Sequence, residues 1–174
     1  IDYYRRVLPL LEGGARTPVL MRLGQVLELV GQWDEAAACY AEALAVAQST
    51  ANLVEGTQAQ IAIGEIQRKR GHFGVAATWF DQAYSAAKAT GDQPGMAKAL
   101  ICSGTLAAQQ GDYAAAATLY EQSLAIRRSL DDQPNVANIL NNLAILAQFQ
   151  GDYSLSRAYH EEALAIRRGL GGQW

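Results

Sequence analysis

Two adjacent asparagines, Asn141 and Asn142, are the side chains of this sequence best suited to holding another polypeptide. A primary amide carries both a hydrogen-bond donor and an acceptor, so it matches the alternating N–H and C=O groups of an extended peptide. The same amides could instead bridge neighbouring helices inside a folded stack, because buried polar groups need partners. Peptide binding and internal bridging are therefore both kept as hypotheses for this pair.

A run of positive charge, Arg68, Lys69 and Arg70, is the second candidate for binding. It could receive an acidic peptide, or it could place favourable charge at the C-terminal end of a helix. The pairs Arg127–Arg128 and Arg167–Arg168 come late in predicted helices and fit the second explanation. The net charge is −3 and the pI is about 5.4, so nucleic acid and anionic membranes are not expected partners.

The residues that usually carry catalysis or bind metals are scattered. His72 and His160 each lack a second ligand at metal-binding spacing. Cys39 and Cys102 show no CxxC spacing, which fits a reducing cytoplasm. The carboxylates of Glu161–Glu162 would point about 100° apart on a helix. No phosphate-binding loop or catalytic triad pattern occurs in the sequence, so we expect no enzyme, no cofactor and no bound metal.

A glycine followed two residues later by an aromatic residue recurs every 40 residues along the chain. The four pairs are Gly31/Trp33, Gly71/Phe73, Gly111/Tyr113 and Gly151/Tyr153. A period of this length indicates a repeat array. Apolar residues at helical spacing lie before and after each glycine, so each repeat predicts two antiparallel helices joined at a left-handed glycine cap.

Small residues recur in the first helix of each predicted pair, where they would let the two backbones approach. They are Gly24, Gly64, Gly104 and Ala144. Large rings of the second helix are expected to fill the space above them. Pro94 and Pro134 are well placed to open helices, whereas the stretch Ser49–Asn52 has no proline and predicts a less sharp helix end.

This pattern resembles the tetratricopeptide repeat over residues 17 to 170. The usual period is about 34 residues, so the longer unit adds close to one turn to each helix. Longer units of this kind are similar to those of kinesin light chain and of bacterial signalling proteins, and the segment Pro134–Arg168 carries the resemblance most clearly. The resemblance implies an all-α fold, a right-handed superhelical solenoid of antiparallel helix-turn-helix repeats with a 40-residue period.

The repeats divide the chain into one solenoid domain excised from a longer array. The expected segments are residues 1–16 as the end of a truncated preceding repeat, then repeats at 17–56, 57–96, 97–136 and 137–174. Tyr4, Val7 and Leu8 fit a second helix, and Gly171–Gln173 resembles the start of a further turn. Exposed repeat ends could support self-association.

In the resembled fold the first helices of successive repeats line a concave face, which implies a peptide-binding site there. Its expected residues in the first two repeats are Met21, Arg22, Gln25, Gln58, Ile61, Glu65, Arg68 and Lys69. In the last two repeats they are Lys98, Ile101, Cys102, Thr105, Asn138, Asn141, Asn142 and Ile145. A chaperone-type clamp, which holds a peptide carboxylate with several polar side chains, is rejected. Only Lys98 fits it, and the positions that need the other polar groups hold Met21, Gln25, Ala62 and Cys102.

Two functions follow from this resemblance. The first is a protein-protein interaction scaffold that binds an extended peptide or a partner helix in its concave groove. The second is a ligand-sensing or oligomerisation arm of a larger bacterial signalling NTPase or transcription regulator. A nucleotide-binding loop elsewhere in the parent protein would favour the second function.

Overall fold

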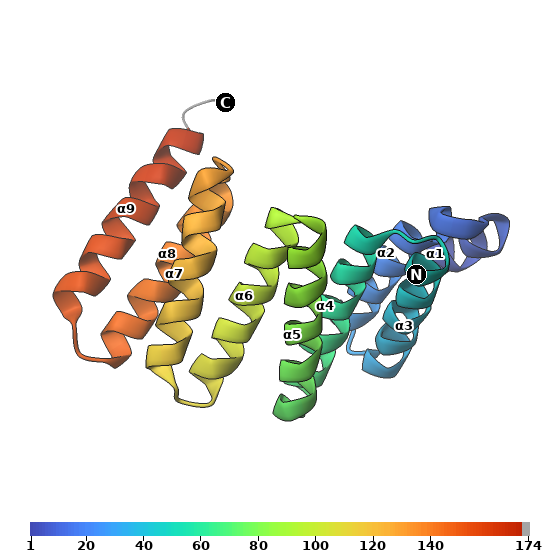
Figure 1. The fold of residues 1–174 in the computed structure, drawn as a ribbon, viewed down its shortest axis with the longest axis horizontal. Helices are drawn as coiled ribbons and strands as arrows, with labels where there is room; N and C mark the ends of the chain where they lie inside the picture. The colour runs from blue at the N-terminus through green and yellow to red at the C-terminus, as the bar shows by residue number, and fades with distance from the viewer. Residues whose placement is uncertain (172–174) are drawn as a thin grey trace. The chain divides into compact units, whose positions relative to one another are not determined.

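The computed structural model describes residues 1–171 of the chain, and these form helices and turns without any strand. The predicted all-α helical repeat fold is thus confirmed (Figure 1). The residues form two compact units, Ile1–Gly95 and a second that begins at Met96. Each unit contains helices that pack against their neighbours in sequence.

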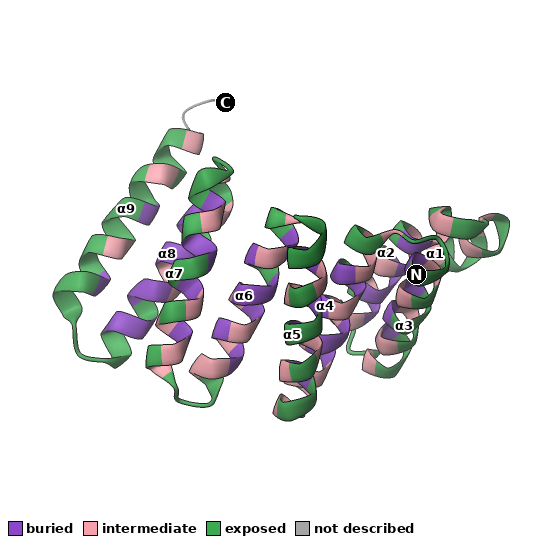
Figure 2. Cartoon of the chain, viewed as in Figure 1, coloured by how far each residue is buried: buried purple, intermediate pink, exposed green. Residues whose placement is uncertain are grey.

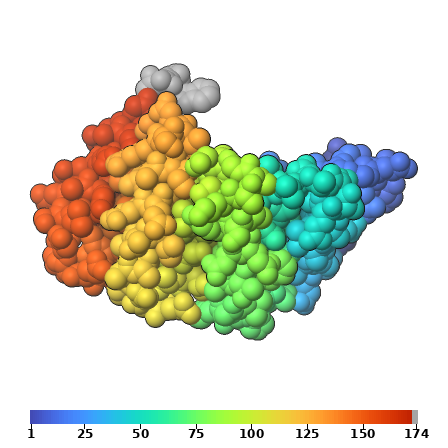
Figure 3. All heavy atoms as spheres, in the orientation of Figure 1, coloured from blue at the N-terminus to red at the C-terminus, as the bar shows by residue number. Residues whose placement is uncertain are grey.

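The first unit opens with short helical segments and continues with two long antiparallel pairs. The short segments are α1 (Asp2–Val7), η1 (Leu8–Leu10) and η2 (Gly13–Ala15). The long helices are α2 (Arg16–Leu29), α3 (Trp33–Ser49), α4 (Leu53–Lys69) and α5 (Phe73–Thr90). Contacts join α2 to α3, α3 to α4 and α4 to α5, and side chains fill the spaces between them (Figure 3).

The second unit repeats the same arrangement. It contains α6 (Gln93–Gln109) from Met96 onward, α7 (Tyr113–Ser129), α8 (Gln133–Phe149) and α9 (Tyr153–Gly171). The Ser123 hydroxyl donates to the Ala97 carbonyl at 2.8 Å and so ties α7 to α6. Helix α8 packs against both α7 and α9. Of the turn predicted at Gly171–Gln173, the last two residues lie outside the described part of the chain.

The turn glycines adopt the left-handed conformation that the sequence predicts. Gly31, Gly71, Gly111 and Gly151 have φ angles between 79° and 83°. Only glycine adopts this conformation without steric cost, and it lets the following N–H groups cap the carbonyls of the preceding helix. The stretch Ser49–Asn52 closes in a similar way, because Ala51 has a φ of 52° and the Asn52 side chain caps α4.

Close approach of the paired helices is also confirmed. A Cβ atom added to Gly64 would lie 2.5 Å from the Phe80 ring, and one added to Gly104 would lie 2.8 Å from Tyr120. Phe80 is fully buried as a result. Buried residues gather on the facing sides of neighbouring helices (Figure 2). The first three hairpins are therefore each held by a ring from the second helix seated on a glycine of the first, whereas the hairpin of α8 and α9 has Ala144 at the glycine position and an exposed His160 at the ring position.

Among the long helices, α9 has the fewest buried residues of those whose burial is given. Leu164 is 46% exposed, whereas Leu124, the equivalent residue 40 positions earlier, is 6% exposed beneath α8. Within residues 153–171 only Ser156 and Ala163 are buried.

The start of α8 is held by a charged cap. Asp132 accepts a hydrogen bond from the Asn135 backbone N–H at 3.3 Å and an ion-pair contact from Arg127 at 2.8 Å. Burial alone would raise the pKa of the Asp132 carboxyl, but the hydrogen bonds from Asn135 and the charge of Arg127 outweigh it. The pKa of Asp132 therefore lies below its ordinary value, which means that folding favours the ionised form.

This lowered pKa predicts a pH-dependent contribution to stability. The contribution of Asp132 should be fully present above its ordinary pKa of 3.8 and should disappear as the pH falls through the lower folded-state value. Urea unfolding of the wild type and of Asp132→Asn between pH 7 and pH 2 measures it. We expect the wild type to have a higher free energy of unfolding than Asp132→Asn at neutral pH, and this difference should disappear in acid. A difference that is the same at both ends of this range would contradict the assignment.

Candidate functional site

A hollow of about 270 Å³ lies in the second unit, between the first helices of its two hairpins. Helix α6 contributes Thr105, Ala108 and Gln109, and α8 contributes Asn142, Ile145, Leu146 and Phe149. Tyr113 and Tyr120 of α7 complete the lining. None of these side chains carries a formal charge, so the hollow is an apolar surface with a few hydrogen-bonding groups at its edge.

The aromatic part of this hollow is pre-formed. The rings of Tyr113 and Phe149 stack with centroids 5.3 Å apart and planes only 6° from parallel. Phe149 is nevertheless 66% exposed, so one face of the stack is open to an incoming group. The Tyr120 hydroxyl lies 3.0 Å from the Thr105 hydroxyl, which also donates to the Ile101 carbonyl at 2.9 Å. These bonds fix the floor of the hollow.

The amides of Asn141 and Asn142 are half-buried. Within residues 1–171 neither side chain forms a hydrogen bond to another residue, so the internal bridging considered above is not seen. Asn138, one turn earlier on α8, accepts a hydrogen bond from Arg167 at 3.3 Å. Asn142 thus combines an amide without a partner in the described chain with a position beside an apolar hollow.

The other residues predicted for the second unit differ in how far they are exposed to solvent. Lys98 is exposed on α6 and Ile101 is half-buried. Cys102 is only 3% exposed, so it is a core residue and not the accessible groove residue that we expected. The prediction for Cys102 was wrong because adjacent residues of a helix point about 100° apart, so Cys102 faces the core although its neighbour Ile101 is only half-buried.

In the first unit the predicted residues form a more polar surface. Ile61 is 5% exposed and belongs to the core, which corrects its expected place in a groove. Arg22 donates to the Gln25 side chain at 3.3 Å, and Met21 packs against the core of α2 and α3. Gln58 is exposed on α4. A second hollow, of about 280 Å³, is lined by Gln25, Glu28, Leu29 and Lys69.

The basic run at the end of α4 is neutralised by neighbouring carboxylates. Arg68 pairs with Glu65 at 2.8 Å, Arg70 pairs with Asp34 at 2.7 Å, and Lys69 pairs with Glu28. Glu28 also accepts a hydrogen bond of 2.5 Å from Tyr40. Burial and this hydrogen bond raise the pKa of Tyr40 above its ordinary value. Lys69 and Arg70 thus link the end of α4 to α2 and α3, and Arg68 pairs within α4, which favours a structural explanation over acidic-peptide binding.

Sequence reasoning missed the aromatic residues of the hollow. From the sequence, Tyr113 stands out only as the aromatic residue after a turn glycine, and Phe149 is not among the expected binding residues. One signal was available. Phe149 is aromatic, whereas the equivalent residues Leu29, Lys69 and Gln109 are not. It ends the first helix of its repeat, and the preceding repeat has an aromatic residue, Tyr113, after its turn glycine.

Among residues 1–171, no cluster of three or more histidine, cysteine, aspartate or glutamate side chains is placed to hold a metal ion. In the same residues, no helix combines the length and the apolar character needed to cross a membrane.

Paired antiparallel helices, repeated with a glycine turn and a ring seated on a glycine, define a helical-repeat protein. The tetratricopeptide repeat model matches residues 16–89 and 95–169. The chain therefore belongs to the tetratricopeptide repeat family. None of the curated proteins matches the chain.

Solved structures share this fold at low sequence identity. BtubC (BKLC) from P. vanneervenii has a TM-score of 0.80 at 20% identity, covering 98% of this chain and 73% of its own. Aspartyl phosphate phosphatase F from Bacillus subtilis has a TM-score of 0.87 at 14% identity, covering 97% of this chain and 44% of its own. The Rap conjugation gene regulator of plasmid pLS20 has a TM-score of 0.87 at 15% identity, covering 98% and 48%. The chain thus spans less than half of the last two proteins.

Proposed function

We propose that this chain is a protein-interaction scaffold that binds an extended peptide across α6 and α8 of its second unit. The observation that carries the proposal is the joint position of the Asn142 amide and the open Tyr113–Phe149 stack beside one hollow. The amide would hold the peptide backbone, and the hollow would receive an apolar side chain. The uncharged lining favours a neutral anchor over an acidic one, because burying an unpaired charge is costly.

Two structural relatives support a peptide as the ligand class. The solved structure of the plasmid pLS20 regulator contains the Phr* peptide, and another Rap protein was solved in complex with the competence and sporulation factor. The second has a TM-score of 0.85 at 18% identity to this chain. These relatives support the binding of a peptide by this kind of fold. The residues proposed to hold the peptide come from the hollow itself.

Selection of a random-sequence peptide library on the 174-residue chain, followed by fluorescence anisotropy, tests this proposal. We expect selected peptides to share an apolar residue. Phe149→Ala should weaken their binding about tenfold, because removing an aromatic anchor from an interface commonly costs about 1.4 kcal/mol or more. Asn142→Ala should weaken it about fivefold, since one peptide hydrogen bond contributes about 1 kcal/mol.

The matched control is Gln122→Ala, which truncates an exposed amide on α7 away from the hollow. It should leave the affinity unchanged. Phe149 is largely exposed, so its replacement should also leave the thermal unfolding curve nearly unchanged. Failure to select any peptide, or equal affinity for the wild type and both hollow variants, would refute this location for the site.

A further inference from the structure

Gln60 is a polar residue at a position where the other repeats place a buried leucine. The equivalent residues are Leu20, Leu100 and Leu140, which are 0%, 6% and 0% exposed. The Gln60 Oε1 atom is buried and accepts no hydrogen bond from any residue in the described part of the chain. A buried acceptor without a donor is energetically unfavourable, so Gln60 is a less stabilising residue here than the leucine of the other repeats.

Two more positions of the hairpin formed by α4 and α5 carry smaller residues than their equivalents. Gly56 of α4 corresponds to Val136, which is buried in α8. Ala86 of α5 corresponds to Val46 and Ile126. A Cβ atom on Gly56 would meet nothing closer than 3.9 Å, so the backbone does not require glycine there. The hairpin of α4 and α5 therefore has less side-chain volume at these positions than the hairpins to which it is compared, although the backbone would accept larger residues.

All three departures line one hollow of about 120 Å³ between α3, α4 and α5. Leu44 and Leu53 supply apolar walls, and Leu53 is 59% exposed at the rim. The hydroxyl of Thr57, which also lines the hollow, donates to the Leu53 carbonyl at 3.0 Å. We name this feature the α3–α5 notch, defined by Leu44, Leu53, Gly56, Thr57, Gln60 and Ala86.

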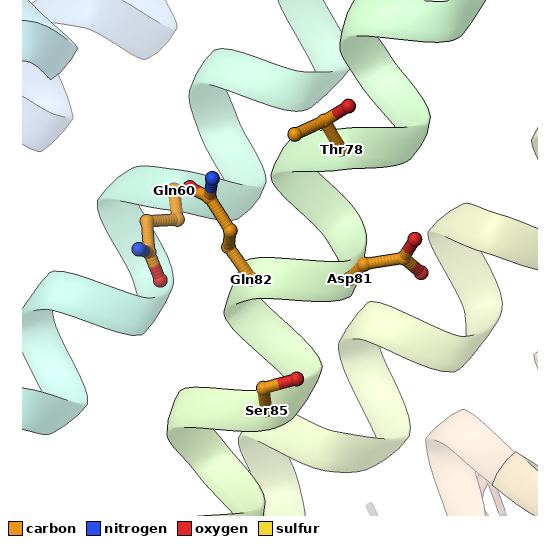
Figure 4. Close-up of a pocket in the computed structure, with 5 residues that line it drawn as sticks. All are labelled: Gln60, Thr78, Asp81, Gln82 and Ser85. Carbon is orange, nitrogen blue, oxygen red and sulfur yellow. The ribbon is translucent and has the colours of Figure 1, made fainter.

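Gln60 lines two hollows and lies between them. Helices α4 and α5 are antiparallel, so the C-terminal end of α5, which contains Ala86, lies beside the start of α4. The second hollow has a volume of about 480 Å³, and Gln82 of α5 reaches toward Gln60 there, with Ser85 also in its lining (Figure 4). Gln60 thus separates a polar surface from the apolar notch.

The chemistry of the notch selects an aromatic ring with a hydrogen-bond donor at its edge. A dry cavity of roughly 150 Å³ is known to hold one benzene ring, so about 120 Å³ in an open notch suits a single ring and not the two rings of an indole. A buried tyrosine hydroxyl normally finds a hydrogen-bond partner. We propose that the α3–α5 notch binds the phenol ring of a tyrosine from a partner protein, with its hydroxyl donating to Gln60 Oε1.

This proposal is independent of peptide binding in the second unit, and small ring probes test it directly. Titration of p-cresol, which is the tyrosine side chain, should shift the methyl NMR signals of Leu44 and Leu53 with a millimolar dissociation constant. Toluene, which lacks the hydroxyl, should bind about tenfold more weakly, a difference of about 1.4 kcal/mol. Signals of Ile145 report separately on the hollow between α6 and α8.

Three variants sharpen the test. Gln60→Met keeps most of the volume but removes the acceptor, so p-cresol should fall to the affinity of toluene. Gly56→Val fills the notch without touching Gln60 and should abolish the shifts of both probes. Gln122→Met changes an exposed glutamine on α7 and should leave the titration unchanged.

Any of three results would overturn the proposal. One is the absence of shifts at Leu44 and Leu53 up to the solubility of p-cresol. Another is equal affinity of the wild type for p-cresol and toluene. The third is undiminished p-cresol binding by Gly56→Val, which would place the ring elsewhere even if Gln60→Met failed to fold.

Discussion

Replacement of Phe80 by alanine should lower the free energy of unfolding by about 3–5 kcal/mol, the largest change expected from a single substitution in this chain. The ring is fully buried and sits on Gly64. Its removal forfeits the free energy gained by burying the ring and adds the cost of the cavity left behind. Because domains of this size are stable by only about 5–15 kcal/mol, urea unfolding followed by circular dichroism should show this loss clearly.

A double-mutant cycle with Gly64→Val tests the contact itself. Valine at position 64 should destabilise the wild type, since its Cβ would lie 2.5 Å from the Phe80 ring. In the Phe80→Ala background the same valine should restore stability by filling the cavity, which gives a coupling energy of about 1–3 kcal/mol. Gly74→Ala is the control, because nothing lies within 4 Å of its added Cβ. Additive effects in the cycle would contradict the close approach.

Replacement of Gln60 by leucine should raise the free energy of unfolding by about 1–3 kcal/mol, the largest stabilisation expected. The substitution removes a buried acceptor that has no donor in the described residues and adds apolar volume beside Leu44 and Leu53. Thermal and urea unfolding measure the gain. Gln82→Leu, on the exposed side of α5, should change stability by less than about 0.5 kcal/mol.

This gain would come with a loss of function if the notch binds a phenol ring. The Gln60→Leu variant should be more stable than the wild type and yet fail to bind p-cresol. Such a combination separates a binding role from a structural role, because a purely structural residue would not lower stability in its native form. A Gln60→Leu variant of unchanged or lower stability would show instead that the amide contributes to folding.

The repeat determined most of what could be predicted about the fold. The left-handed turn at Gly31 and the seating of Phe80 on Gly64 both follow from residue types at fixed spacing. Such features depend on contacts within one hairpin. The turn at Ala51 was harder to foresee, because alanine rarely adopts a positive φ and only the neighbouring Asn52 cap reveals the tight connection.

The site was predicted only in part, since it depends on contacts between hairpins. Thr105, Asn142 and Ile145 line the hollow as residues of the predicted surface. The ring stack of Tyr113 on Phe149 joins residues of different hairpins, and the 40-residue pattern does not contain this pairing. For the same reason the sequence did not predict the ion pair of Lys69 with Glu28, which lies 41 positions earlier in another hairpin.

Glu28 has a consequence for how the first unit unfolds. Its carboxylate accepts from Tyr40 of its own hairpin and pairs with Lys69 of the next. In repeat proteins, stability is the sum of an intrinsic energy for each repeat and an interface energy between neighbours, and the interface energy determines cooperativity. One carboxylate here contributes to both energies. The first two hairpins are thereby coupled at this point, so they should lose structure as a single cooperative block and not one hairpin at a time.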